Sequence, residues 1–105
     1  MSNALTRLAK TIEERRDANP SKSWTAKLLS RGPEKCAQKF GEEAVETIIE
    51  AAQGNKKKLV EESADMLYHF LVMLASRDVS YDDVLKELES REGKSGIYEK
   101  ASRRA

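Results

Sequence analysis

The chain has 105 residues, and its 19 basic and 18 acidic side chains leave a formal net charge of +1. This length predicts a single domain over residues 1–105, and the balanced charge excludes a strong field that would attract nucleic acid or a membrane surface. The high charged fraction, 35%, and low aromatic fraction, 6%, are typical of a soluble all-α protein.

The cysteine content and the N-terminus both indicate a cytoplasmic protein. Cys36 is the single cysteine, so it forms no disulfide within the chain and builds no zinc site by itself. No apolar run approaches the ~18 residues of a membrane span, and the N-terminus lacks the apolar core of a signal peptide. We therefore expect Cys36 to be structural and the chain to remain in the cytoplasm.

Hydrophobic periodicity and capping residues predict five helices. They are expected over residues 3–18, 23–30, 33–53 and 56–77, with a fifth running from Ser80 to Gly93. The expected start signals are Ser21 or Ser23, Pro33, Asn55 and Ser80. Gly54 and Gly93 are expected to end the third and fifth helices.

Each predicted helix carries apolar side chains that we expect to pack inward. In chain order they are Leu5, Leu8, Ala9 and Ile12; Trp24, Leu28 and Leu29; Ala37, Phe40, Gly41, Ala44, Ile48 and Ala51; Val84, Leu85 and Leu88. Residues 66–75 are apolar on nearly every side, which predicts burial all round. In so short a chain, such burial indicates a subunit interface.

Two groups of acidic residues suggest a metal site. Glu42, Glu43 and Glu46 lie at i, i+1 and i+4 of the third helix, and Glu62 and Asp65 lie at i and i+3 of the fourth. On antiparallel helices these spacings aim the carboxylates at one space, where their mutual repulsion requires a cation. The alternative is that they form the solvated face of an amphipathic helix.

The fourth helix favours the metal site over the solvated face. Glu62 and Asp65 belong to a narrow polar stripe that runs into an otherwise apolar helix, where unpaired acids are unfavourable. His69, one turn after Asp65, is either a hydrogen-bonded core residue or a contact to a ligating carboxylate. Because neither acidic group has the Glu-x-x-His pattern of di-iron sites, carboxylate ligation indicates Mg²⁺, with Mn²⁺ possible.

Such a site suits phosphoanhydride cleavage by water. The metal neutralises phosphate charge and lowers the pKa of a water molecule, which a nearby carboxylate positions or deprotonates. The basic tail, residues 91–105, carries five basic and two acidic side chains, a balance of +3. It is either simply solvated or contacts phosphate groups.

Residues 39–46 (Lys-Phe-Gly-Glu-Glu-Ala-Val-Glu) and 61–69 (Glu-Glu-Ser-Ala-Asp-Met-Leu-Tyr-His) resemble the Glu-Glu-x-x-Glu and Glu-x-x-Asp signature of the MazG-like, all-α nucleotide pyrophosphohydrolases. Residues 24–29, 64–72 and 91–103 make the chain most similar to the phosphoribosyl-ATP pyrophosphatase branch of histidine biosynthesis. The resemblance covers roughly residues 5 to 103.

This resemblance implies an Mg²⁺-dependent helical homodimer that hydrolyses phosphoribosyl-ATP to phosphoribosyl-AMP and pyrophosphate. It implies that the metal ligands are Glu43, Glu46, Glu62 and Asp65. Glu42 becomes a further ligand or the base that orients water. The residues implied to contact phosphate are Lys39, Lys94, Lys100 and Arg103.

Two alternatives remain at the level of the sequence. A house-cleaning pyrophosphatase of free nucleoside triphosphates shares the acidic motif without needing this tail. The second alternative is a non-catalytic helical dimerisation module, in which the same acids are solvated charges and bind no specific metal.

Overall fold

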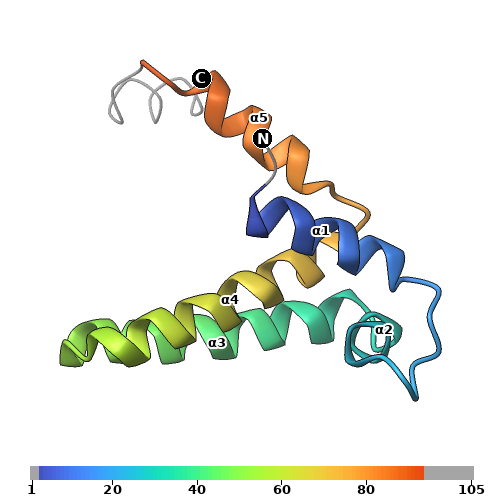
Figure 1. Ribbon diagram of the computed structural model, residues 1–105, viewed down its shortest axis with the longest axis horizontal. Coiled ribbons are helices and arrows are strands. Elements are labelled where there is room, and N and C mark those ends of the chain that lie inside the picture. The colour runs from blue at the N-terminus through green and yellow to red at the C-terminus, as the bar shows by residue number, and fades with distance from the viewer. Residues whose placement is uncertain (1–2, 94–105) are drawn as a thin grey trace.

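The computed structural model describes residues 3–93, which form five α-helices and no strand. The helices are α1 (Ala4–Glu14), α2 (Trp24–Ser30), α3 (Pro33–Gln53), α4 (Lys56–Ser76) and α5 (Tyr81–Ser90) (Figure 1). This order confirms the all-α prediction. No helix in this part of the chain is long and apolar enough to cross a lipid bilayer.

The ends of the helices follow the local sequence. Ser23, Asn55 and Ser80 each accept a hydrogen bond from a backbone N–H in the first turn of their helix, and Pro33 opens α3. Gly54 ends α3 in the left-handed conformation, with φ 76°. These capping predictions are confirmed.

The first helix is shorter than predicted, because α1 ends at Glu14 rather than at residue 18. Its last turn tightens where the Arg15 N–H reaches both the Thr11 and Ile12 carbonyls. Arg16 then leaves the helical path and donates a 2.7 Å hydrogen bond to the Ala75 carbonyl of α4. This tertiary contact stabilises a turn where propensity alone allowed further helix.

The core lies at one end of the α3–α4 pair, where α1 and α2 pack against α4 and the start of α3 (Figure 1). Its buried residues are Ile12, Leu28, Cys36, Leu71, Val72 and Ala75. Cys36 is structural, as predicted: it is 1% exposed, and its thiol donates to the Leu28 carbonyl at 3.2 Å. The prediction for Trp24 is wrong, because its side chain is 51% exposed and does not anchor α2.

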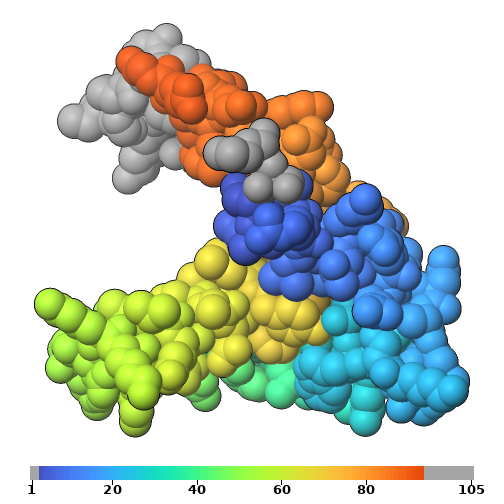
Figure 2. Space-filling view, viewed as in Figure 1, coloured from blue at the N-terminus to red at the C-terminus, as the bar shows by residue number. Residues whose placement is uncertain are grey.

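α3 and α4 form an antiparallel hairpin that packs along its length and projects beyond α1 and α2 (Figure 1). Near the core, the Phe40 and Phe70 rings meet with centroids 5.9 Å apart. Figure 2 shows the free end of the hairpin standing clear of the other helices. Its geometry positions the acidic residues.

The faces of this hairpin differ from the prediction. On α3, Glu43 and Glu50 of the acidic arc are half-buried, whereas Ile48 of the expected apolar arc is 64% exposed. Burial of residues 66–75 on every side is also incomplete, because Leu67 remains exposed. The exposed large apolar residues of the hairpin are Val45, Ile48, Ile49, Val60 and Leu67.

α5 leads away from the hairpin (Figure 1), and only its beginning joins the core, through Tyr81. Val84 and Leu85 are half-buried, but Leu88 is 56% exposed, so the prediction that it packs inward is wrong.

Candidate metal centre

The hairpin brings together three of the four expected metal ligands. One carboxylate oxygen from each of Glu43, Glu62 and Asp65 lies within 4.8 Å of the other two. Glu43 comes from α3 and is half-buried. Glu62 and Asp65 come from one turn of α4; Glu62 is half-buried, whereas Asp65 is exposed. The cluster therefore opens to solvent on one side.

Glu46, the fourth expected ligand, borders this cluster one turn along α3 from Glu43. Its side chain is exposed. Its carboxyl group is nevertheless close enough to Glu62 for hydrogen bonding, and its charge acts on both Glu43 and Glu62. The structure thus groups three of the four carboxyl groups directly, and Glu46 lies at their border.

The crowding of these acids changes their proton affinity. Burial, followed by the charges of Glu46 and Asp65, raises the pKa of Glu43 above its ordinary value of 4.5. The hydrogen-bonding contact with Glu46, followed by burial, raises the pKa of Glu62. Both shifts reflect repulsion among the neighbouring acids, which the charge of Lys39 offsets only in part at Glu43.

The orphaned oxygens of the cluster fit a hard divalent cation. Oε2 of Glu43 and Oε2 of Glu62 are buried and have no hydrogen-bond partner in the described part of the chain. Buried carboxylate oxygens without a partner are unfavourable unless they bind a proton or a metal. An oxygen-only set of donors suits Mg²⁺ or Mn²⁺ rather than a softer ion.

Glu42 lies beside this cluster and has other partners. Its carboxylate accepts a 2.9 Å hydrogen bond from the Gln38 side chain and forms a 3.4 Å ion pair with Lys39. The hydrogen bond from Gln38 is the largest cause that lowers the pKa of Glu42, and the charge of Lys39 is the second. The exposed carboxylate of Glu42 is therefore ionised at neutral pH. Both roles left open for Glu42, as a further ligand or as a base, need this charged form.

His69 lies on α4 one turn beyond Asp65 and is half-buried. Its ring packs edge-on against Tyr68, and its buried Nδ1 has no hydrogen-bond partner among residues 3–93. Burial first, then the charge of Lys39, lowers the pKa of His69, while Asp65 and Glu42 act in the opposite direction. The imidazole is therefore neutral at pH 7, and among residues 3–93 no hydrogen bond to Nδ1 supports the alternative of a hydrogen-bonded core residue.

A residue that the sequence did not single out joins the two acidic helices. The Thr47 hydroxyl lies 2.8 Å from the Glu43 carbonyl and 3.1 Å from the Glu62 carbonyl. Its position four residues after Glu43 was the available signal, since that spacing places it on the same face of α3. A threonine within a helix has, however, no sequence pattern that marks such a contact.

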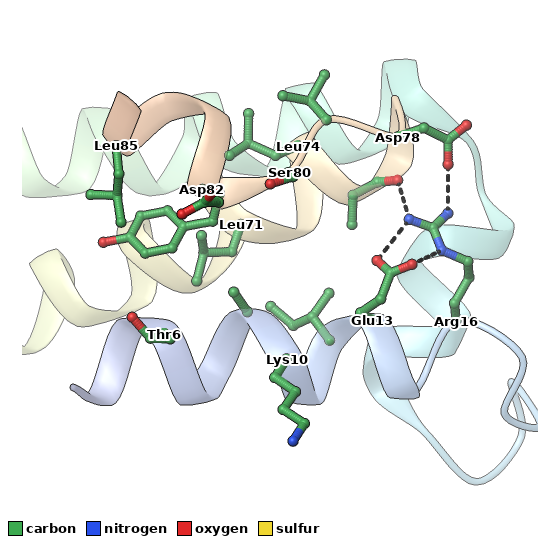
Figure 3. Close-up of a pocket in the computed structure, with 15 residues that line it drawn as sticks. Thr6, Lys10, Glu13, Arg16, Leu71, Leu74, Asp78, Ser80, Asp82 and Leu85 are labelled. Carbon is green, nitrogen blue, oxygen red and sulfur yellow. Dashed lines mark hydrogen bonds and ion pairs between the residues drawn. The ribbon is translucent and has the colours of Figure 1, made fainter. Parts of the chain in front are cut away.

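A groove of about 410 Å³ lies elsewhere, between α1, the end of α4 and the start of α5 (Figure 3). Its carboxylates already have cationic partners: Arg16 pairs with Glu13 at 3.1 Å and with Asp78 at 3.3 Å, and Lys86 pairs with Asp82 at 3.2 Å. Unlike the α3–α4 cluster, this groove has no unpaired negative charge that would bind a metal. Size alone therefore does not identify the reactive site.

The expected phosphate contacts divide into two sets. Lys39 is described, and its ammonium group lies at the edge of the acidic cluster, paired with Glu42. Lys94, Lys100 and Arg103 fall outside the described residues.

Known proteins resemble the chain over nearly its whole length. A family model described as phosphoribosyl-ATP pyrophosphohydrolase matches residues 5–92. A protein of Ruegeria pomeroyi named phosphoribosyl-ATP pyrophosphatase is 69% identical over 96 residues, which cover 91% of each chain. Proteins with the same name from Paracoccus denitrificans and Dinoroseobacter shibae are 66% and 67% identical, over 95% and 94% of this chain and 93% and 97% of their own.

Proposed function

Because the chain belongs to the phosphoribosyl-ATP pyrophosphohydrolase family, we propose that its acidic α3–α4 cluster is the active site and works with a divalent cation. The enzyme hydrolyses phosphoribosyl-ATP to phosphoribosyl-AMP and pyrophosphate, the second step of histidine biosynthesis. The observation that supports the site is the convergence of three carboxylate oxygens within 4.8 Å.

We assign the cation as Mg²⁺, with Mn²⁺ as a substitute, held by Glu43, Glu46, Glu62 and Asp65. The orphaned oxygens and raised pKa values of Glu43 and Glu62 support this assignment. The chemistry that a bound Mg²⁺ supplies is neutralisation of phosphate charge and activation of water.

The remaining polar residues would orient the water and the substrate. Glu42 acts as the base that orients or deprotonates the attacking water, or as an additional ligand. Its lowered pKa keeps it ionised, which suits a ligand or a group that orients water, but it also makes Glu42 a weaker base. Lys39 contacts a phosphate oxygen once substrate competes with Glu42 for its ammonium group. We assign the same role to Lys94, Lys100 and Arg103. Cleavage by water between the α- and β-phosphates then releases pyrophosphate.

The active form is proposed to be a homodimer built on the exposed side of the hairpin. Val45, Ile48, Ile49 and Val60 would be unfavourably hydrated in a single chain, and a second copy of the hairpin would cover them. We place this enzyme in the cytoplasm, where its reduced Cys36 is expected.

The first experiment is to measure pyrophosphate release from phosphoribosyl-ATP beside ATP, dCTP and dUTP. Turnover of phosphoribosyl-ATP alone is expected, and it should require Mg²⁺ or Mn²⁺. Calorimetric titration with Mn²⁺ should show saturable binding to the wild-type protein. Full activity after removal of divalent cations with a chelator would contradict the metal-dependent mechanism, and turnover of free triphosphates would contradict the substrate.

A further inference from the structure

The two helices that carry the acidic cluster are connected on both sides of it. Towards the core, the Phe40 and Phe70 rings pack together with centroids 5.9 Å apart. Towards the free end, the Thr47 hydroxyl lies between the main chains of Glu43 and Glu62, 2.8 Å and 3.1 Å from their carbonyl oxygens. Thr47 therefore connects one candidate ligand of α3 to one of α4.

The contact with Glu62 is what distinguishes Thr47 from an ordinary helical threonine. Threonine hydroxyls often bond to the carbonyl four residues earlier, as Thr11 does to Arg7 at 3.1 Å on α1. Thr47 makes the same local bond and also meets a carbonyl 15 residues away on the neighbouring helix. Because a hydroxyl has one proton, the two carbonyls share it.

The cluster needs such a connection because its charges repel one another. Without a cation, ionised Glu43, Glu46, Glu62 and Asp65 push α3 and α4 apart at this level. The half-buried Thr47 hydroxyl opposes that separation through the backbone, next to the ligands but without using their carboxylates. A metal then meets donors that are already at a suitable spacing.

We propose that Thr47 is a positioning residue, whose hydroxyl holds the main chains of Glu43 and Glu62 at the separation at which their carboxylates bind one cation. This inference rests on the proposed function, because it takes the cluster to be the metal site. Thr47 itself would touch neither metal nor substrate.

The test compares Thr47→Val, which keeps the shape but removes the hydroxyl, with Thr47→Ser, which keeps the hydroxyl. Thr11→Val is the matched control, since it removes a local helical hydroxyl bond far from the cluster. In Mn²⁺ calorimetry we expect Thr47→Val to bind about tenfold more weakly than wild type. Thr47→Ser and Thr11→Val should remain within about twofold of wild type.

Turnover provides a second readout. If Thr47 only positions the ligands, raising the Mg²⁺ concentration should restore most of the kcat of Thr47→Val. A purely structural role would lower the Tm of the metal-free variant without changing Mn²⁺ affinity, and that result would overturn the proposal. If Thr47→Val does not fold, Thr47→Ala takes its place in the same titration, and the same tenfold loss is expected.

The outcomes separate this inference from the function on which it rests. If wild-type protein binds no Mn²⁺, the metal site and the role of Thr47 both fail. If wild type binds Mn²⁺ and the hydroxyl-free variant binds it equally well, only the role of Thr47 is overturned. Failure of Thr47→Ser to retain wild-type affinity would also overturn it.

Discussion

The two halves of the α3–α4 hairpin are built in opposite ways. The inner half, residues 33–42 and 68–76, has an apolar interior in which Cys36, Leu71 and Val72 are buried under α1 and α2. The outer half, residues 43–67, has Glu43, Thr47 and Glu62 half-buried where its helices meet. Several of its large apolar residues, among them Ile48 and Val60, are exposed instead.

This difference shows where the stability of each half comes from. The inner half is stabilised by removing apolar surface from water within one chain. The outer half gains little in that way and carries repelling charges inside, so it needs ligands that bind the folded state. A cation between the helices and a second subunit on their outer surface would supply what the outer half lacks.

The largest expected effect comes from changing the outer half at Glu46. We expect Glu46→Gln to lower kcat/KM about a thousandfold, since a metal contributes several kcal/mol to stabilising the transition state. The fold and the assembly should be retained. Removing this carboxylate also relieves the repulsion on Glu43 and Glu62, so the metal-free variant should be at least as stable as wild type.

The control for this variant is Glu61→Gln, which removes the same charge from an exposed position of α4 next to Glu62. Pyrophosphate release should be unchanged in the control. Near-normal turnover of Glu46→Gln would show that Glu46 is not a ligand.

The next effect concerns the core that the inner half shares with α1 and α2. Leu28 is 0% exposed, and Leu28→Ala should lower the free energy of unfolding by about 3 kcal/mol because it leaves a cavity. Urea denaturation would measure this loss. Because Leu28 and the acidic cluster share no contacts, saturating Mn²⁺ should stabilise the variant and wild type by the same amount. A smaller stabilisation of the variant would mean that the two halves are coupled.

The sequence predicted the helix ends better than the buried faces of the hairpin, and the physical reason is specific. Caps such as Ser23, Asn55 and Ser80 act locally, so their effect is visible within a few residues. The face of α3 that meets α4 was assigned by the rule that apolar residues turn inward, and this rule fails where acids lie inside. Spacing alone predicted that Glu43, Glu62 and Asp65 lie close together, as the structure places them, while the contact of Thr47 with Glu62 depends on how the helices align.

A smaller effect is expected when the exposed side of the outer half is changed. Ile48→Asp places a charge in the apolar surface that we assign to the dimer, and should weaken dimerisation by at least about tenfold. Sedimentation velocity across a dilution series would measure it. Leu88→Asp is the control, since Leu88 is similarly exposed, at 56% against 64% for Ile48, but lies on α5. If only the Leu88 variant dissociates, the dimer surface has been assigned to the wrong helix.

The smallest effect is the pH dependence of the outer half. The native pKa values of Glu43 and Glu62 lie above their ordinary value of 4.5, so native metal-free protein binds protons more tightly than the unfolded chain does. Their contribution to stability is complete below about pH 4.5 and is lost as pH rises through the raised pKa values. Mn²⁺ competes with these protons, so the increase in Tm that it produces should grow with pH over the same range.

His69 changes the pH dependence of stability in the opposite direction. Its native pKa is lowered from 6.5, so its contribution to stability is lost as pH falls. The Tm of metal-free wild type is therefore compared with that of Glu46→Gln, since both retain His69. The variant should lose less stability than wild type as pH rises, because contact with Glu46 is the largest cause of the raised pKa of Glu62. Identical pH profiles would mean that Glu46 does not act on the cluster.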